Sequence, residues 1–203
     1  MPTNPTPSVL YLASSSPRRS LLVSILGVRQ VIIKPSGIDE NLVGNFTPSE
    51  YAAELALQKA LATRTLLSSG DDCGIILGAD TIVVIHNTIL GKPTDPDDAV
   101  RMLKTLSDNT HTVYTGIALV HSGNGESRTF VESTEVNFRA ITDQEIARYV
   151  ASGSPMDKAG SYGIQDDHGA VFINRIEGDY YNVVGLPLCA TYLQLQDFAP
   201  SLF

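Results

Sequence analysis

Hydrophobic and polar positions alternate along this chain in short stretches that predict both strands and helices. Runs of apolar, often β-branched residues predict strands at residues 9–13, 31–33, 75–85, 112–122, 128–138 and 170–176. Apolar residues spaced three or four positions apart predict helices at about residues 17–26, 48–67, 96–106, 143–151 and 186–195. This order of elements predicts an α/β protein with a mixed, twisted sheet flanked by helices.

Local signals place the ends of several of these elements. Ser16-Pro17 is typical of a helix start, and the segments Thr47–Glu50 and Thr142–Glu145 each have the pattern of a capping box. The sequence Gly123-Asn124-Gly125 predicts a hairpin turn between two strands. In the first helix, Leu21, Leu22, Ile25 and Leu26 are expected to form one apolar face.

Composition narrows the class of protein. The 203 residues are 43% hydrophobic, which is enough for a packed core, and the formal net charge of −8 argues against a nucleic-acid-binding protein. No apolar run reaches the ~18 residues of a membrane helix, so no membrane partner is expected. Residues 1–8 are rich in Pro and Thr and are expected to be a disordered tail without a secretion signal, ahead of a single domain at 9–203. The two cysteines, Cys73 and Cys189, favour a cytoplasmic protein with reduced thiols.

The segment Ser14-Ser15-Ser16-Pro17-Arg18-Arg19 is the first candidate for a binding site. A strand that leads into a helix N-terminus presents backbone N–H groups and the positive end of the helix dipole. Three hydroxyls and two guanidinium groups at that point would suit a polyphosphate. The alternative is an ordinary N-cap followed by two arginines that face solvent.

Asp80 is the second candidate, because it lies within a long apolar stretch. A carboxylate in a buried strand is costly unless it is paired, hydrogen-bonded or bound to a metal. Gly78 and Ala79 before it would leave room for a ligand. Asp39-Glu40 could join Asp80 around a divalent cation such as Mg²⁺, although a solvated turn would explain that pair as well. Asp80 could also be a strand-end residue that caps a loop.

Three further candidates are basic or amide-bearing. Lys59 shares a predicted helix face with small and apolar residues, and Lys92 lies in the rigid turn Gly91-Lys92-Pro93. The glycine-containing segment 157–165 favours a binding loop, in which Tyr162 could stack on a base and Gln165 could contact a base edge. Surface lysines and a polar surface loop are the alternatives.

Taken together, these motifs resemble the Maf family of nucleoside triphosphate pyrophosphatases. The motifs that carry the resemblance are residues 14–19, Asp39-Glu40, Lys59-Ala60, 78–81, 91–93, 114–116, 157–160 and 182–188. The resemblance implies an elongated, two-lobed α/β fold related to that of inosine triphosphate pyrophosphatases, with a central cleft, often in a homodimer. It also implies metal-dependent release of pyrophosphate from a nucleotide, with Mg²⁺ as the expected ion and Mn²⁺ as a substitute. The pattern Asp-Lys-Ala-Gly-x-Tyr-x-Ile-Gln is similar to that of the branch that hydrolyses dTTP and UTP.

The resemblance assigns a role to each candidate. Asp80 would accept a proton or hold the metal together with Glu40, and Arg19, Lys59 and Lys92 would stabilise charge on the phosphates. The residues expected to bind the substrate are Ser14, Ser16, Arg18, Thr81, Lys158, Tyr162 and Gln165, of which Arg18, Thr81 and Gln165 would set the base preference.

One departure and two alternatives accompany this interpretation. After Gln165 the chain continues Asp166-Asp167-His168-Gly169, which is one residue longer than the family pattern, and the added carboxylates would repel a triphosphate unless they point outward or help to hold the metal. The same phosphate-binding residues could serve a non-catalytic, nucleotide-binding regulator of cell division. They could also serve a phosphohydrolase that acts on phosphate esters or on non-standard purine nucleotides.

Overall fold

A computed structural model describes residues 6–38, 40, 42–68, 74–165 and 168–203 of the chain. The strands are β1 (Val9–Leu12), β2 (Val31–Ile33), β3 (Gly74–Ile85), β4 (Thr88–Leu90), β5 (Thr110–His121), β6 (Ser127–Phe138) and β7 (Ile173–Glu177). The α-helices are α1 (Pro17–Ile25), α2 (Pro48–Thr65), α3 (Pro96–Leu106), α4 (Asp143–Ala151), α5 (Tyr180–Val184) and α6 (Leu188–Phe198). No helix in this part of the chain is long and apolar enough to span a membrane.

The seven strands form one sheet in the order β2-β1-β3-β5-β6-β7, with β4 paired to β3. β1 pairs in parallel with both β2 and β3, whereas β4 and β7 pair antiparallel with β3 and β6. The expected α/β fold with a mixed sheet and flanking helices is therefore confirmed.

The chain divides into two compact units. The first unit comprises Met1–Asp80, Thr115–Glu132 and Gly185–Phe203, and the second comprises Thr81–Tyr114 and Ser133–Val184. Strands β3, β5 and β6 each contribute residues to both units.

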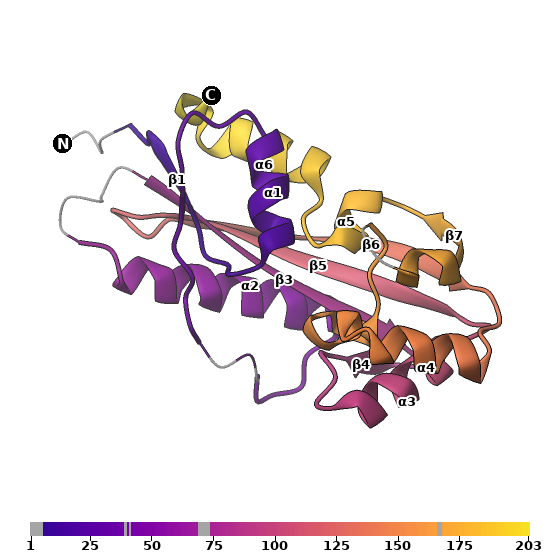
Figure 1. Cartoon of the computed structure of the whole chain (residues 1–203). Helices are drawn as coiled ribbons and strands as arrows, with labels where there is room; N and C mark the ends of the chain where they lie inside the picture. Colours follow the sequence, from indigo (N-terminus) through magenta and orange to yellow (C-terminus); the bar gives the residue numbers. More distant parts are fainter. Residues whose placement is uncertain (1–5, 39, 41, 69–73, 166–167) are drawn as a thin grey trace. The chain divides into compact units, whose positions relative to one another are not determined.

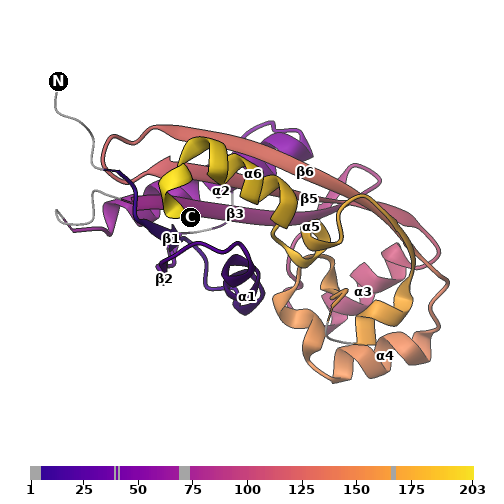
Figure 2. The ribbon, with the colours of Figure 1, turned by 90° about the horizontal axis from the view of Figure 1, so that it is seen from above.

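In the first unit, α2 lies along one face of the strands and α6 lies on the opposite side (Figures 1 and 2). Two glycines allow α2 to approach the sheet closely. A Cβ atom on Gly78 would lie 2.1 Å from the carbonyl oxygen of Ala56, and one on Gly116 would lie 2.1 Å from that of Ala52. These two glycines therefore determine how closely α2 packs against β3 and β5.

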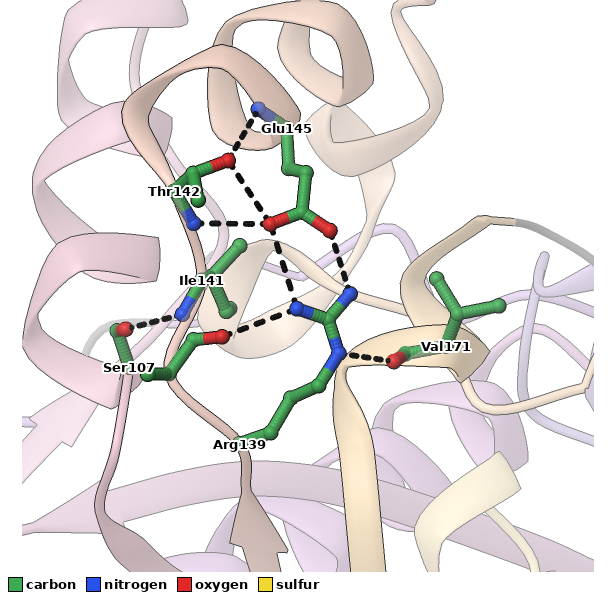
Figure 3. Close-up of polar contacts among 7 residues, drawn as sticks. Ser107, Arg139, Ile141, Thr142, Glu145 and Val171 are labelled. Atoms are coloured by element: carbon green, nitrogen blue, oxygen red, sulfur yellow. Dashed lines mark hydrogen bonds and ion pairs between the residues drawn. The ribbon is translucent and has the colours of Figure 1, made fainter.

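The second unit has its own apolar core, built from β3, β5, β6, α3, α4 and the segment around Phe172. Arg139 links the N-terminus of α4 to the segment that precedes β7 (Figure 3). Arg139 donates to Glu145 Oε1 at 2.6 Å and to the carbonyl oxygen of Val171 at 2.8 Å. Glu145 also accepts from the backbone N–H of Thr142, so the capping box and the arginine form one connected group.

Most of the sequence-based elements are confirmed, but three details of the prediction are wrong. Leu21 and Ile25 are 62% and 59% exposed, so the buried face of α1 is formed by Leu22 and Val23, with Leu26 just beyond the helix. The strand expected to begin at residue 170 begins at Ile173, because residues 168–172 form a 3₁₀ turn. The short elements β4 and α5 were not predicted. Residues 1–5 of the expected tail lie outside the described residues.

Candidate active site

The turn between β1 and α1 is held by its own hydroxyl groups. Ser14 Oγ accepts a hydrogen bond from the backbone N–H of Ser16 at 3.2 Å and from Arg19 Nη1 at 3.4 Å. Ser16 is the N-cap of α1, and its Oγ accepts from the backbone N–H of Arg19. Both predicted phosphate ligands, Ser14 and Ser16, thus also shape the turn and position Arg19.

Arg19 is fixed at the start of α1. Its Nε donates to the carbonyl oxygen of Gly185 at 2.9 Å. Burial lowers the pKa of Arg19, while the negative charges of Asp80 and Glu40 act in the opposite direction. An arginine remains charged despite such a shift, so a permanent positive charge lies within the field of two carboxylates.

Lys59, Asp80 and Glu40 form the centre of this group. Lys59 Nζ lies 2.7 Å from Asp80 Oδ1 and 2.7 Å from Glu40 Oε1. The side chains of Lys59 and Asp80 are only 7% and 8% exposed, whereas that of Glu40 is 47% exposed. A buried lysine and a buried aspartate are each costly alone, and their direct pairing offsets part of that cost.

The close approach of α2 to the sheet explains why this pair forms. Lys59 lies on the buried face of α2, and Gly78 lies two residues before Asp80 on β3. The expectation that Gly78 leaves room for a ligand is wrong, because that space is filled by the backbone of α2 at Ala56.

The carboxylates of Glu40 and Asp80 fit a divalent cation. Both contact the same ammonium group, so their nearest oxygens lie no further apart than twice 2.7 Å. Mg²⁺ is commonly held by one or two carboxylates, with substrate phosphates and water as the remaining ligands. Among the described residues no group of three His, Cys, Asp or Glu side chains could hold a metal, and Asp39 lies outside them.

The other predicted site residues belong to the second unit. Thr81 follows Asp80 on β3, Lys92 is exposed in the loop after β4, and Gln165 is partly buried. The backbone N–H of Gly160 donates to the carbonyl oxygen of Gly91 at 3.0 Å, which joins the Lys92 loop to the segment that contains Lys158. The predicted site residues are thus divided between the two units. The first unit holds Ser14, Ser16, Arg18, Arg19, Glu40, Lys59 and Asp80, and the second holds Thr81, Lys92, Lys158, Tyr162 and Gln165.

Lys158 is held by its own loop. Its Nζ donates to the carbonyl oxygen of Ser154 at 2.6 Å and lies 3.0 Å from Asp157 Oδ1. The side chain is only 10% exposed, so its ammonium group contacts its own loop rather than solvent.

Tyr162 is part of the second unit's core. Its hydroxyl lies 2.8 Å from His111 Nε2, and its ring packs edge-on against His111 and Phe138. The residue is 5% exposed, and burial raises the pKa of its hydroxyl. In this structure the Tyr162 ring contacts protein rings, and its stacking on a base stays a prediction.

Two functional features were missed by the sequence interpretation. The carbonyl oxygen of Gly185 anchors Arg19, and this contact joins segments that are 166 positions apart in the sequence. Gly160 and Ser161 have φ values of 68° and 63°, so the backbone of the predicted binding loop is left-handed at both positions. In the sequence, Gly160 indicated the turn in that loop, whereas no feature near Gly185 indicated a contact with Arg19. Cys73, Asp166 and Asp167, singled out from the sequence, lie outside the described residues.

The protein is thus a mixed α/β protein in which two carboxylates lie beside lysine and arginine side chains. Its sequence matches the family described as "Maf-like protein" over residues 9–198. It is 45% identical to the "dTTP/UTP pyrophosphatase" of Bacillus cereus, over 93% of this chain and 95% of the relative. It is 48% identical to the protein of that name from Moorella thermoacetica, over 89% and 90% of the two chains. The chain belongs to the Maf family.

A comparison of structures finds a more distant similarity. The structure of a HAM1 protein from Coxiella burnetii is 15% identical and covers 94% of this chain and 99% of its own, with a TM-score of 0.49.

Proposed function

We propose that this protein hydrolyses dTTP and UTP to the nucleoside monophosphate and pyrophosphate. The names of its relatives support this activity, since both similar proteins are called dTTP/UTP pyrophosphatases. The observation that carries the proposal is the contact of Lys59 with both Asp80 and Glu40 at 2.7 Å, next to the arginine-bearing N-terminus of α1.

The positive groups of the first unit would bind the triphosphate. Arg19, held by Gly185, and Lys59 would stabilise the charge that builds on the phosphate oxygens during bond cleavage. The positive end of the α1 dipole, with Arg18 in its first turn, adds to this field. Ser14 and Ser16 would keep Arg19 in place and present their hydroxyls to the phosphates. Lys92 would contribute a further positive charge from its exposed loop.

Glu40 and Asp80 would hold a divalent ion, Mg²⁺ or Mn²⁺, that neutralises part of the phosphate charge. Asp80 has two competing roles. Its carboxylate would either take the proton from the attacking water or hold the ion, because a carboxylate bound tightly to a metal is a weaker base. In the free protein the buried carboxylate is held by its contact with Lys59.

The base would be selected by groups outside this centre. Arg18, Thr81 and Gln165 are the proposed determinants, with Lys158 and Tyr162 supporting the loop that carries Gln165. An amide such as that of Gln165 can both donate to and accept from the edge of a pyrimidine.

The test is a separation of products after incubation with Mg²⁺ and a panel of nucleotides: dTTP, UTP, CTP, ATP, dGTP and 7-methyl-GTP. Pyrophosphate with dTMP or UMP is the expected result. Release of orthophosphate would indicate a different phosphohydrolase. Tight binding of nucleotide without turnover would indicate a regulator, and either result would overturn the proposal.

Two further parts of the proposal rest on the cysteine content, which favours the cytoplasm, and on the family resemblance, which implies a homodimer. We place the protein in the cytoplasm, where its nucleotide substrates occur, and expect it to be a homodimer. Light scattering coupled to gel filtration would measure the mass in solution, which would be twice 21.8 kDa for a dimer.

A further inference from the structure

A single ammonium group contacts both carboxylates that would hold the metal. Lys59 Nζ is 2.7 Å from Glu40 Oε1 and 2.7 Å from Asp80 Oδ1, and the lysine side chain is 7% exposed. The ammonium therefore occupies the position between the two oxygens to which a divalent ion would also be drawn. Two positive charges cannot share the same pair of oxygens without repelling each other.

Side chains of both charges lie at this point among the described residues. Glu40 and Asp80 carry two negative charges, and Lys59 and Arg19 carry two positive charges. A divalent ion added alone would place two further positive charges beside those of Lys59 and Arg19. A triphosphate brings several negative charges, which would offset both the ion and the lysine.

The side chain of Lys59 is also long enough to exchange a carboxylate for another hydrogen-bond acceptor. Its backbone is fixed in the middle of α2, where Gly78 lets the helix lie close to β3. The ammonium lies at the end of a four-carbon stem with three rotatable N–H donors, so it can turn from a carboxylate to a phosphate without movement of the helix.

We propose that Lys59 is an exchangeable counter-ion that makes divalent-cation binding depend on the nucleotide. In the free protein it holds Glu40 and Asp80 together. When a triphosphate arrives, the ammonium turns to the phosphate oxygens and leaves the two carboxylates to the metal. This inference rests on the proposed function, and it adds that the metal binds with the nucleotide rather than before it.

The first test measures Mn²⁺ binding to the protein without nucleotide, from the electron paramagnetic resonance signal of free Mn²⁺. Lys59→Met and Lys59→Gln should each bind Mn²⁺ at least about ten-fold more tightly than the wild type. Lys59→Gln keeps N–H donors for the carboxylates, which guards against a loss of fold. Lys59→Arg keeps the positive charge and should show no gain.

Lys104→Met is the matched control. Lys104 is an exposed lysine paired with Asp143, so this variant makes the same change in net charge elsewhere. It should leave Mn²⁺ affinity within about two-fold of the wild type, because exposed charges are screened by salt. The proposal is overturned if the folded Lys59→Gln protein also stays within that range.

The second test measures coupling between metal and nucleotide. A dTTP analogue with a non-hydrolysable α,β-bridge should tighten Mn²⁺ binding strongly in the wild type, after correction for Mn²⁺ bound by the analogue in solution. In Lys59→Gln this enhancement should shrink at least about five-fold, because the counter-ion no longer has to be displaced. An unchanged enhancement would overturn the proposal. Neither test uses turnover, so a protein that binds Mn²⁺ as expected but does not hydrolyse dTTP would contradict only the proposed function.

Discussion

At the scale of single residues, the protein buries two basic side chains in opposite ways. Lys59 is surrounded by carboxylates that match a positive charge. His111 is 2% exposed, and its ring contacts the rings of Phe138 and Tyr162. Burial without a charged partner lowers the pKa of His111 from 6.5 to about 4, so the folded protein holds this ring neutral at neutral pH.

The His111 pKa predicts a dependence of stability on pH. Between about pH 6.5 and pH 4 the unfolded chain binds a proton at His111 and the folded chain does not. The free energy of unfolding should therefore fall as the pH is lowered through this range, by up to about 3 kcal/mol. Urea unfolding at a series of pH values would measure it.

His111→Gln should be less sensitive to pH than the wild type across that range. His168→Gln, at an exposed position, is the control and should keep the wild-type slope. Equal slopes for the wild type and His111→Gln would show that His111 is not the group responsible.

At the scale of secondary-structure elements, glycines decide where α2 can lie. Gly78→Ala would place a Cβ 2.1 Å from the Ala56 carbonyl oxygen, so α2 must move away from β3. We expect a loss of about 1–3 kcal/mol in the free energy of unfolding, and a fall in turnover because Lys59 moves with the helix. Gly91→Ala meets no atom within 4 Å and should leave stability nearly unchanged. Similar unfolding midpoints for the two variants would contradict this explanation.

The capping box at the start of α4 is a second example, because its Glu145 also binds Arg139. Arg139 and Thr142 lower the pKa of Glu145 from 4.5 to about 2. The ionised carboxylate therefore stabilises the folded protein above about pH 4.5, and this contribution is lost as the pH falls toward 2. Glu145→Gln should lower the melting temperature at pH 7, and by less at pH 3.

Glu50→Gln provides the comparison, because Glu50 has the same place in the capping box of α2 and bonds only to Thr47 in that box. Its effect at pH 7 should be smaller than that of Glu145→Gln. An equal or larger effect would mean that Arg139 adds nothing to the cap.

Local patterns predicted most elements because their signals lie within a few residues. Both capping boxes and the Ser16 cap form as the sequence indicates. The buried face of α1 was predicted wrongly, because spacing shows which residues share a face but not which face meets the core. Leu21 and Ile25 share such a face and remain exposed.

At the scale of the whole molecule, the candidate site is assembled from distant segments. Three segments of the first unit contribute to it: a strand with Asp80, a helix with Lys59 and a loop with Glu40. Arg19 bonds to the carbonyl oxygen of Gly185, which is 166 positions away in the sequence. The sequence singled out Asp80 because a carboxylate in an apolar strand needs a partner. It could not identify that partner as Lys59, since the pairing depends on how closely α2 packs against β3.

The two sets of predicted site residues meet in the chain at the bond between Asp80 and Thr81. The first set holds most of the groups proposed for phosphate and metal, together with Arg18, and the second holds Lys92 and the other groups proposed to select the base. Variants at Lys59 or Asp80 should lower turnover on every nucleotide, whereas Gln165→Ala should mainly change the ratio of turnover on dTTP to turnover on the other nucleotides. Steady-state kinetics on the nucleotide panel would separate the two effects.

The most direct test of the proposed activity is pyrophosphate release from dTTP by Asp80→Asn, compared with the wild type and with Asp197→Asn. Asp197 is an exposed carboxylate paired with Arg128 and serves as the control. If Asp80 takes the proton or holds the metal, Asp80→Asn should lose at least about a thousand-fold in kcat, while its circular dichroism spectrum stays that of the wild type. Asp197→Asn should turn over normally. A folded Asp80→Asn protein that keeps a tenth or more of wild-type turnover would contradict the account.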